Sequence, residues 1–159
     1  MSIGLYTKYH VERHDERAQL FHLIVERYGV GSGVYPGCFV HVTPSFFIPR
    51  MVYVDTEKRA ERFFAQGEAL ALVNERKSYR DEPEIAFHRQ DYTEPLPIPE
   101  ETVDLLISQY AGFVSEHCKR YLRSGGILLA NNSHGDAGLA ACDPDFALIA
   151  VVEPRVESF

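Results

Sequence analysis

Residues 131–136, Asn-Asn-Ser-His-Gly-Asp, form the densest polar stretch that follows a predicted buried strand. A histidine that titrates near neutral pH can act as a general base, and a nearby carboxylate can orient its ring. His134 and Asp136 are therefore the candidate catalytic residues. The alternative is that the Asn and Asp side chains cap a helix that begins near Asp136.

Two histidines near the N-terminus could do a second kind of chemistry. His10 and His14 share a face if the first helix begins early, and Asp15 follows them. Such a group can bind a metal ion, but no HExxH pattern and no closing ligand follow it. A solvated helix start explains these residues better, and we expect no metal site.

The elements that must position these residues alternate between helices and strands. The helical spacing of apolar residues predicts a helix within residues 11–28, ended by Gly29. Further helices are expected at residues 43–47, 57–66, 69–76, 115–122 and from 136 onward. Apolar, β-rich runs predict strands at residues 33–37, 51–55, 85–89, 103–108, 127–130 and 146–152.

Apolar strands that alternate with helices predict an α/β fold. Right-handed crossovers make it a doubly wound, mostly parallel sheet between two layers of helices. Ligands in such sheets bind beyond the carboxyl ends of the strands. The candidate binding residues are those that follow the predicted strands: Gly37, Cys38, Asp55, Asp91, Tyr92, Ser108 and Gln109.

Composition narrows the class of protein. The chain has 159 residues, 45% of them apolar, which suits a single domain over residues 1–159 with residues 1–29 as an N-terminal helical segment. A net charge of -7 disfavours nucleic acid as the partner. The apolar runs are far shorter than the ~20 residues of a membrane helix. There is also no signal pattern, so we expect a cytoplasmic protein without a membrane partner.

The second half of the chain resembles the class I S-adenosylmethionine-dependent methyltransferases. Asp91, then Leu96-Pro97, then Val-Asp-Leu-Leu-Ile-Ser at 103–108 resembles the acid, linker and fourth strand of that family. Residues 121–129, Tyr-Leu-Arg-Ser-Gly-Gly-Ile-Leu-Leu, resemble the entry into its fifth strand. The resemblance covers roughly residues 34–152 and implies strand order 3-2-1-4-5, with residues 146–152 as a sixth edge strand.

This resemblance assigns roles to the candidate binding residues around S-adenosylmethionine. Asp55 would accept hydrogen bonds from the ribose hydroxyls, for which a carboxylate offers two acceptors; its alternative role is to stabilise the start of a helix. Asp91 would hold the adenine amino group, with Tyr92 against the ring, unless it only forms a turn. Gly37 and Cys38 would approach the methionine part, and Ser108 and Gln109 would border the substrate side.

The expected function is methyl transfer to a small-molecule or protein acceptor. The loop after the first strand keeps one glycine, Gly37, and has Phe39 and His41 where the family has others. This departure favours the alternative of a non-catalytic domain used for binding or assembly. A second alternative is a nicotinamide-dependent dehydrogenase, in which Asp55 would also suit a ribose, but no G-x-G-x-x-G follows a strand.

The last strand of the predicted sheet has an open edge. The family closes its sheet with an antiparallel pair of strands, and residues 146–152 supply only one of them. An uncovered apolar edge invites pairing with another chain. We therefore expect either a truncated chain or a homodimer that covers this edge.

Overall fold

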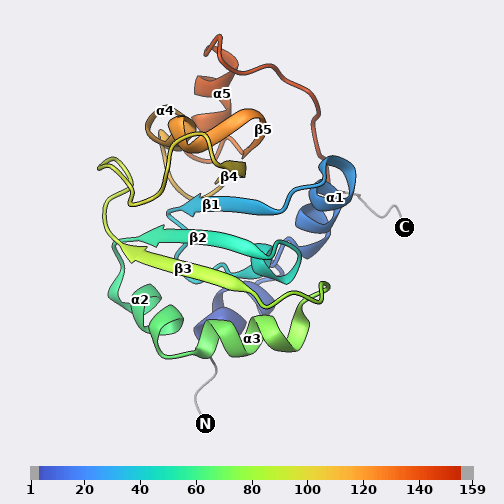
Figure 1. Ribbon diagram of the computed structural model, residues 1–159, viewed down its shortest axis with the longest axis vertical. Coiled ribbons are helices and arrows are strands. Elements are labelled where there is room, and N and C mark those ends of the chain that lie inside the picture. The colour runs from blue at the N-terminus through green and yellow to red at the C-terminus, as the bar shows by residue number, and fades with distance from the viewer. Residues whose placement is uncertain (1–3, 155–159) are drawn as a thin grey trace.

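The computed structural model describes residues 4–154. Within them, five parallel strands form one sheet in the order β3-β2-β1-β4-β5, which confirms the predicted order (Figure 1). The strands are β1 (Ser32–Pro36), β2 (Arg50–Asp55), β3 (Glu84–Arg89), β4 (Val103–Ser108) and β5 (Leu122–Ala130).

Helical segments connect the strands. They are η1 (Thr7–Val11), α1 (Ala18–Tyr28), η2 (Thr43–Phe46), α2 (Lys58–Ala65), α3 (Glu68–Arg76), α4 (Val114–Cys118), η3 (Lys119–Tyr121) and α5 (Asp136–Ala141). None of the helices within residues 4–154 is long and apolar enough to span a membrane.

Alternation along the strands creates two cores, one on each face of the sheet. Leu105 and Ile107 of β4 pack with buried residues of α1, α2 and α3, whereas Leu106 packs with Val114 and Cys118 of α4. Successive strand side chains point to opposite faces, so apolar residues in a row need cover on both. The result is the expected three-layer α/β/α arrangement (Figure 1).

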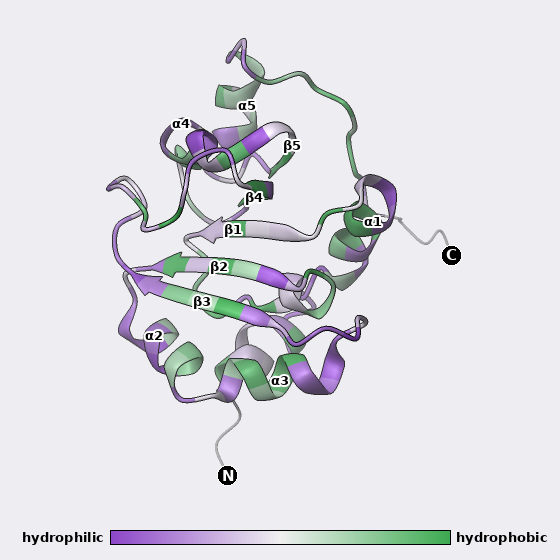
Figure 2. Ribbon diagram, in the orientation of Figure 1, coloured by the Kyte–Doolittle hydropathy of each residue, from purple (hydrophilic) through white to green (hydrophobic). Residues whose placement is uncertain are grey.

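The predicted sixth strand is wrong. Residues 146–152 form neither strand nor helix and pair with no strand among the described residues. Figure 2 shows this stretch as a hydrophobic path that leaves α5, and Leu148 and Val151 are 85% and 73% exposed. An apolar β-rich run becomes a strand only where an open edge accepts its backbone groups, and this run lies away from β5. The homodimer stays a prediction.

The N-terminal helix is shorter than predicted and is preceded by a separate turn. Residues 11–28 were expected to be helical, but a π-helical turn ends at Val11 and α1 begins at Ala18. His14 and Arg17 between them have positive φ angles of 53° and 59°, which no right-handed helix permits. Residues 4–17 therefore form a distinct segment, here called the N-terminal strap.

Candidate functional site

The carboxyl ends of β1, β2 and β4 lie side by side, because β1 pairs with both neighbours. Asp55, the last residue of β2, connects two of the loops that follow these strands. One carboxylate oxygen accepts a hydrogen bond of 2.7 Å from the Phe39 amide, and the other accepts one of 2.9 Å from the Glu57 amide. Asp55 thus holds the loop after β1 and also steadies the start of α2.

The loop after β1 is packed tightly against the loop after β4. Gly37 has a φ of 69°, and a Cβ added to it would lie 2.6 Å from the Cβ of Ala111. Cys38 is wholly buried, and burial raises the pKa of its thiol well above the usual value. Because only a thiolate reacts readily, Cys38 is a packing residue whose contribution to a ligand would come through its backbone.

Phe39 occupies a position at which the resembling family has a glycine. Its φ of 48° is the conformation that a glycine would adopt with ease. The Phe39 ring meets the Tyr9 ring edge to face at 5.0 Å, and the Arg59 guanidinium lies 5.0 Å from its centre. The loop therefore keeps a glycine-like backbone but fills the adjacent space with an aromatic ring.

His41, the second residue at a glycine position, belongs to the core. It is wholly buried; its Nε2 lies 2.9 Å from the Glu16 carbonyl and its Nδ1 lies 2.7 Å from the Tyr35 hydroxyl. A carbonyl can only accept, so Nε2 carries the hydrogen and Nδ1 accepts from Tyr35. Burial lowers the pKa of His41 to about 3, with the neighbouring His10 adding to the effect. The ring is neutral at pH 7.

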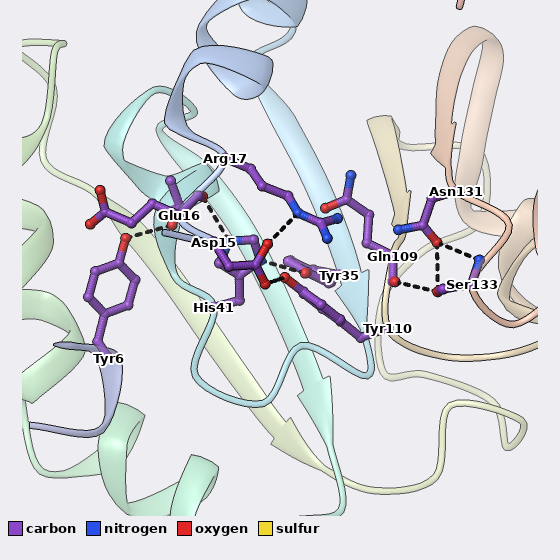
Figure 3. Close-up of polar contacts among 11 residues, drawn as sticks. Tyr6, Asp15, Glu16, Arg17, Tyr35, His41, Gln109, Tyr110, Asn131 and Ser133 are labelled. Carbon is purple, nitrogen blue, oxygen red and sulfur yellow. Dashed lines mark hydrogen bonds and ion pairs between the residues drawn. The ribbon is translucent and has the colours of Figure 1, made fainter. Parts of the chain in front are cut away.

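The N-terminal strap lies across the ends of β1 and β4 (Figure 3). The Tyr6 hydroxyl bonds to Thr43 at 2.7 Å, and the His10 ring stacks on His41 at 4.3 Å. The Tyr110 hydroxyl, from the loop after β4, donates to the Asp15 carboxylate. Asp15 and Tyr110 are 95 positions apart, so no local spacing in the sequence could have indicated this contact.

Asp136 does not orient His134, and this part of the prediction is wrong. Its wholly buried carboxylate accepts hydrogen bonds from the Ser108 hydroxyl at 2.5 Å and from the Ser115 hydroxyl and amide at 2.7 and 3.0 Å. The start of α5 faces the end of β4, which turns Asp136 inward. His134 is exposed, and its Nδ1 lies 3.1 Å from the Ser133 hydroxyl.

The loops after β4 and β5 meet beside this buried cluster. The Ser133 hydroxyl lies 3.1 Å from the Gln109 carbonyl and 2.9 Å from the Asn131 side-chain oxygen. Gln109 is only 3% exposed, and its side-chain oxygen Oε1 has no hydrogen-bond partner among the described residues. The structure therefore gathers Ser108, Gln109 and the loop that carries His134 at one place.

Asp91 and Tyr92 lie at the end of β3, on the other flank. One Asp91 oxygen accepts from the Thr93 amide at 2.9 Å and hydroxyl at 2.8 Å, and these bonds lower the pKa of the exposed carboxyl. The Tyr92 hydroxyl donates to the Gly112 carbonyl at 2.6 Å, which joins this loop to the one after β4. Asp91 therefore forms the turn that was the alternative to a role in adenine binding. Its second oxygen stays at the surface.

A shallow hollow lies between Asp55 and Asp91. It is lined by Thr56, Glu61, Arg89 and Gln90. Arg89 closes one side through a 3.1 Å bond from its Nε to the Thr56 carbonyl. Among residues 4–154, no group of three or more His, Cys, Asp or Glu side chains is arranged to hold a metal ion.

Comparisons with known proteins identify the fold. No protein-family model and no curated protein sequence matches the chain. Among solved structures, a methyltransferase from Geobacter sulfurreducens superposes with a TM-score of 0.54 and 16% identity, over 86% of this chain and 75% of that one. The N-methyltransferase NodS from Bradyrhizobium japonicum WM9 gives 0.51 and 18%, over 78% and 69%. The chain has the class I methyltransferase fold.

The same fold also carries another reaction. The [4+2]-cyclase SpnF superposes with a TM-score of 0.50 and 15% identity. The superposition covers 71% of this chain but only 44% of SpnF. At such identities the similarity concerns the backbone fold alone. The function must therefore be argued from the side chains at the carboxyl edge of the sheet.

Proposed function

We propose that this protein is an S-adenosylmethionine-dependent methyltransferase whose cofactor lies across Gly37, Asp55, Asp91 and Ser108. The observation that carries the proposal is the hydrogen bonding of the Asp55 carboxylate. Each of its oxygens accepts one backbone hydrogen bond, which leaves one lone pair on each oxygen for a diol. A half-exposed carboxylate at the end of β2, beside the loop after β1, is suited to the two hydroxyls of a ribose.

The other residues of the edge extend this site on both sides of Asp55. The free oxygen of Asp91 would accept from the adenine amino group, and Tyr92 would border the adenine ring. The backbone of Gly37 and Cys38 would approach the methionine part, next to Ser108 and Gln109. The bound cofactor supplies an electrophilic methyl group on sulfur, and an in-line transfer asks the protein mainly for positioning.

His134 is the proposed general base for the acceptor. Its ring is exposed beside Ser133, so a substrate and solvent can both reach it. Asp136 contributes indirectly, because its bond to Ser108 fixes the end of β4 against α5. His134→Ala should then reduce turnover and leave cofactor affinity unchanged, whereas a purely structural role would predict no effect on turnover.

A second candidate function is a non-catalytic domain used for binding or assembly. The observation that favours it is the packing of Phe39 against Tyr9 and Arg59, where the resembling family leaves space above glycines. If this ring fills the methionine part of the site, the wild-type protein will not bind the cofactor. Phe39→Gly should then restore affinity, because its backbone already has a glycine-like φ.

Calorimetric titration distinguishes these functions. Wild-type protein is titrated with S-adenosylhomocysteine, S-adenosylmethionine and NAD. Under the proposal it binds the first two, and Asp55→Asn weakens the binding of S-adenosylhomocysteine at least tenfold, about 1.4 kcal/mol. Asp145→Asn, which alters an exposed carboxylate paired with Lys119, is the matched control and should not change the affinity.

Each remaining outcome has a definite meaning. Binding of NAD in place of the adenosyl compounds would support a dehydrogenase. No binding by wild type, with none gained in Phe39→Gly, would refute the methyltransferase and leave the non-catalytic function. Because Asp55 also holds two backbone amides, circular dichroism and a melting curve must show that Asp55→Asn remains folded.

A further inference from the structure

Arg17 of the N-terminal strap lies in a site that is built to hold a cation. Its Nε donates to one Asp15 oxygen at 2.9 Å, and its guanidinium lies 4.9 Å from the centre of the Tyr110 ring. The Tyr110 hydroxyl donates to the other Asp15 oxygen, which fixes the carboxylate beside the ring. A carboxylate and an aromatic face together favour a positive charge with N–H donors.

Asp15 remains a strong acceptor in spite of its partial burial. Burial alone would raise the pKa of Asp15, but the hydrogen bonds from Tyr110 and Arg17 lower it overall. The carboxylate is therefore charged at pH 7. Of the neighbouring groups, His41 is neutral at pH 7, so it does not compete with Arg17 for this charge.

An independent observation indicates that Arg17 does not satisfy the whole site. The Oε1 atom of Gln109 is buried and accepts no hydrogen bond from any described residue. Figure 3 shows the Gln109 amide directed toward the Arg17 side chain. A buried acceptor without a donor is unfavourable and is uncommon in native proteins. A ligand with several N–H donors could bond to Asp15 and Gln109 together.

The Arg17 side chain can also move out of this site. The Arg17 φ of 59° is disfavoured for any residue except glycine, and His14, three residues earlier, has a φ of 53°. The His10 ring of the strap is buried, and both of its nitrogens lack a hydrogen-bond partner among the described residues. Among the described residues, the Arg17 side chain makes one hydrogen bond, to Asp15. It can therefore leave while Asp15 stays bonded to Tyr110 and Glu16 stays bonded to His41 and Arg76.

We propose that Asp15, Gln109 and Tyr110 form a binding site for an alkylammonium group, which Arg17 fills when no ligand is bound. The site lies at the ends of β1 and β4, where ligands of parallel α/β sheets bind. This inference rests on the proposed function, since there the alkylammonium group belongs to the methyl acceptor. The acceptor is accordingly an amine-bearing molecule, anchored through its positive charge.

The test removes Arg17 and supplies a substitute cation. Arg17→Gly is the first variant, because glycine tolerates the positive φ, and Arg17→Ala is the second. Each is titrated with n-butylammonium chloride at low, constant ionic strength, and binding is followed by amide chemical shifts. Both variants should bind it at least tenfold more tightly than wild type, and the resonances of Gln109 and Tyr110 should shift. The neutral analogue n-butanol should not bind.

Matched variants show whether the cation occupies the proposed site. Adding Asp15→Asn or Gln109→Leu to Arg17→Gly should abolish most of the gain. Arg27→Ala removes a guanidinium that lies 5.8 Å from the Tyr28 ring at the end of α1, and it should give no gain. Equal affinities of wild type and both Arg17 variants for n-butylammonium would refute the proposal, as would a gain that survives Asp15→Asn.

The source of the cation is tested separately from the methyltransferase proposal. Asp15→Asn should leave the affinity for S-adenosylhomocysteine unchanged. A tenfold loss of that affinity would overturn the assignment to the acceptor, because the cation would then be the amino group of the cofactor. The n-butylammonium titrations contain no adenosyl compound. Their result therefore stands even if wild type fails to bind S-adenosylhomocysteine.

Discussion

Acidification should destabilise this protein through His41 well before its carboxylates are protonated. His41 is wholly buried between the Tyr35 hydroxyl and the Glu16 carbonyl, and its pKa is lowered to about 3 by burial and by His10. In the unfolded chain the same imidazole has a pKa of about 6.5. Between these two values the unfolded state binds a proton that the folded state excludes.

The sign and size of the effect follow from this difference. The contribution of His41 to the free energy of unfolding is complete above pH 6.5. It falls as the pH drops below the pKa of the unfolded state and levels off near pH 3. Within that window the slope approaches about 1.4 kcal/mol per pH unit. Lowering the pH from 7.5 to 5.0 should therefore reduce the free energy of unfolding by about 2 kcal/mol from His41 alone. Burial also lowers the pKa of His10, which adds to the loss.

Urea unfolding at a series of pH values from 7.5 to 5.0 measures this loss. His41→Gln keeps a polar side chain but does not titrate. It should be less stable than wild type at pH 7.5, with a pH dependence that is flatter by about 2 kcal/mol over the range. His22→Gln is the matched control, since the His22 side chain is 53% exposed on α1. Parallel pH profiles for wild type and His41→Gln would refute the reasoning.

Two further predictions concern the loops that form the site. Asp136→Ala should lower the free energy of unfolding by about 3 kcal/mol in urea, because it leaves the Ser108 and Ser115 hydroxyls and the Ser115 amide without their buried acceptor; a loss below about 1 kcal/mol would contradict a buried acceptor of three hydrogen bonds. Gly37→Ala should lower the melting temperature by several degrees, since the added Cβ meets Ala111 and the φ is positive; an unchanged melting temperature would show that the two loops separate easily.

Sequence by itself determined the architecture of the sheet. Runs such as Val-Asp-Leu-Leu-Ile-Ser at 103–108 are apolar on both faces, so they required helices on both sides and a parallel arrangement. The resemblance in the second half of the chain then gave the strand order, and Asp55 was placed correctly at the end of β2. The apolar runs and the position of Asp55 are short-range patterns, which the sequence displays directly, whereas the strand order followed from the resemblance to a known family.

Tertiary structure decided which of the candidate residues touch one another. The partners of Asp136 are 28 and 21 positions away, and the partner of Tyr110 is 95 positions away, so spacing along the chain carries no trace of either contact. The sequence likewise could not determine whether residues 146–152 form a strand. An apolar run becomes a strand only if it lies beside a free edge of the sheet.

The N-terminal strap shows the physical reason most clearly. Its polar residues looked like the solvated start of a helix, but the positive φ angles of His14 and Arg17 turn the chain back over the ends of β1 and β4. His41, which the sequence showed only as a lost glycine, became a buried neutral imidazole beneath it. Protonation states and cation sites depend on which groups exclude water from one another, and only the folded chain brings those groups together.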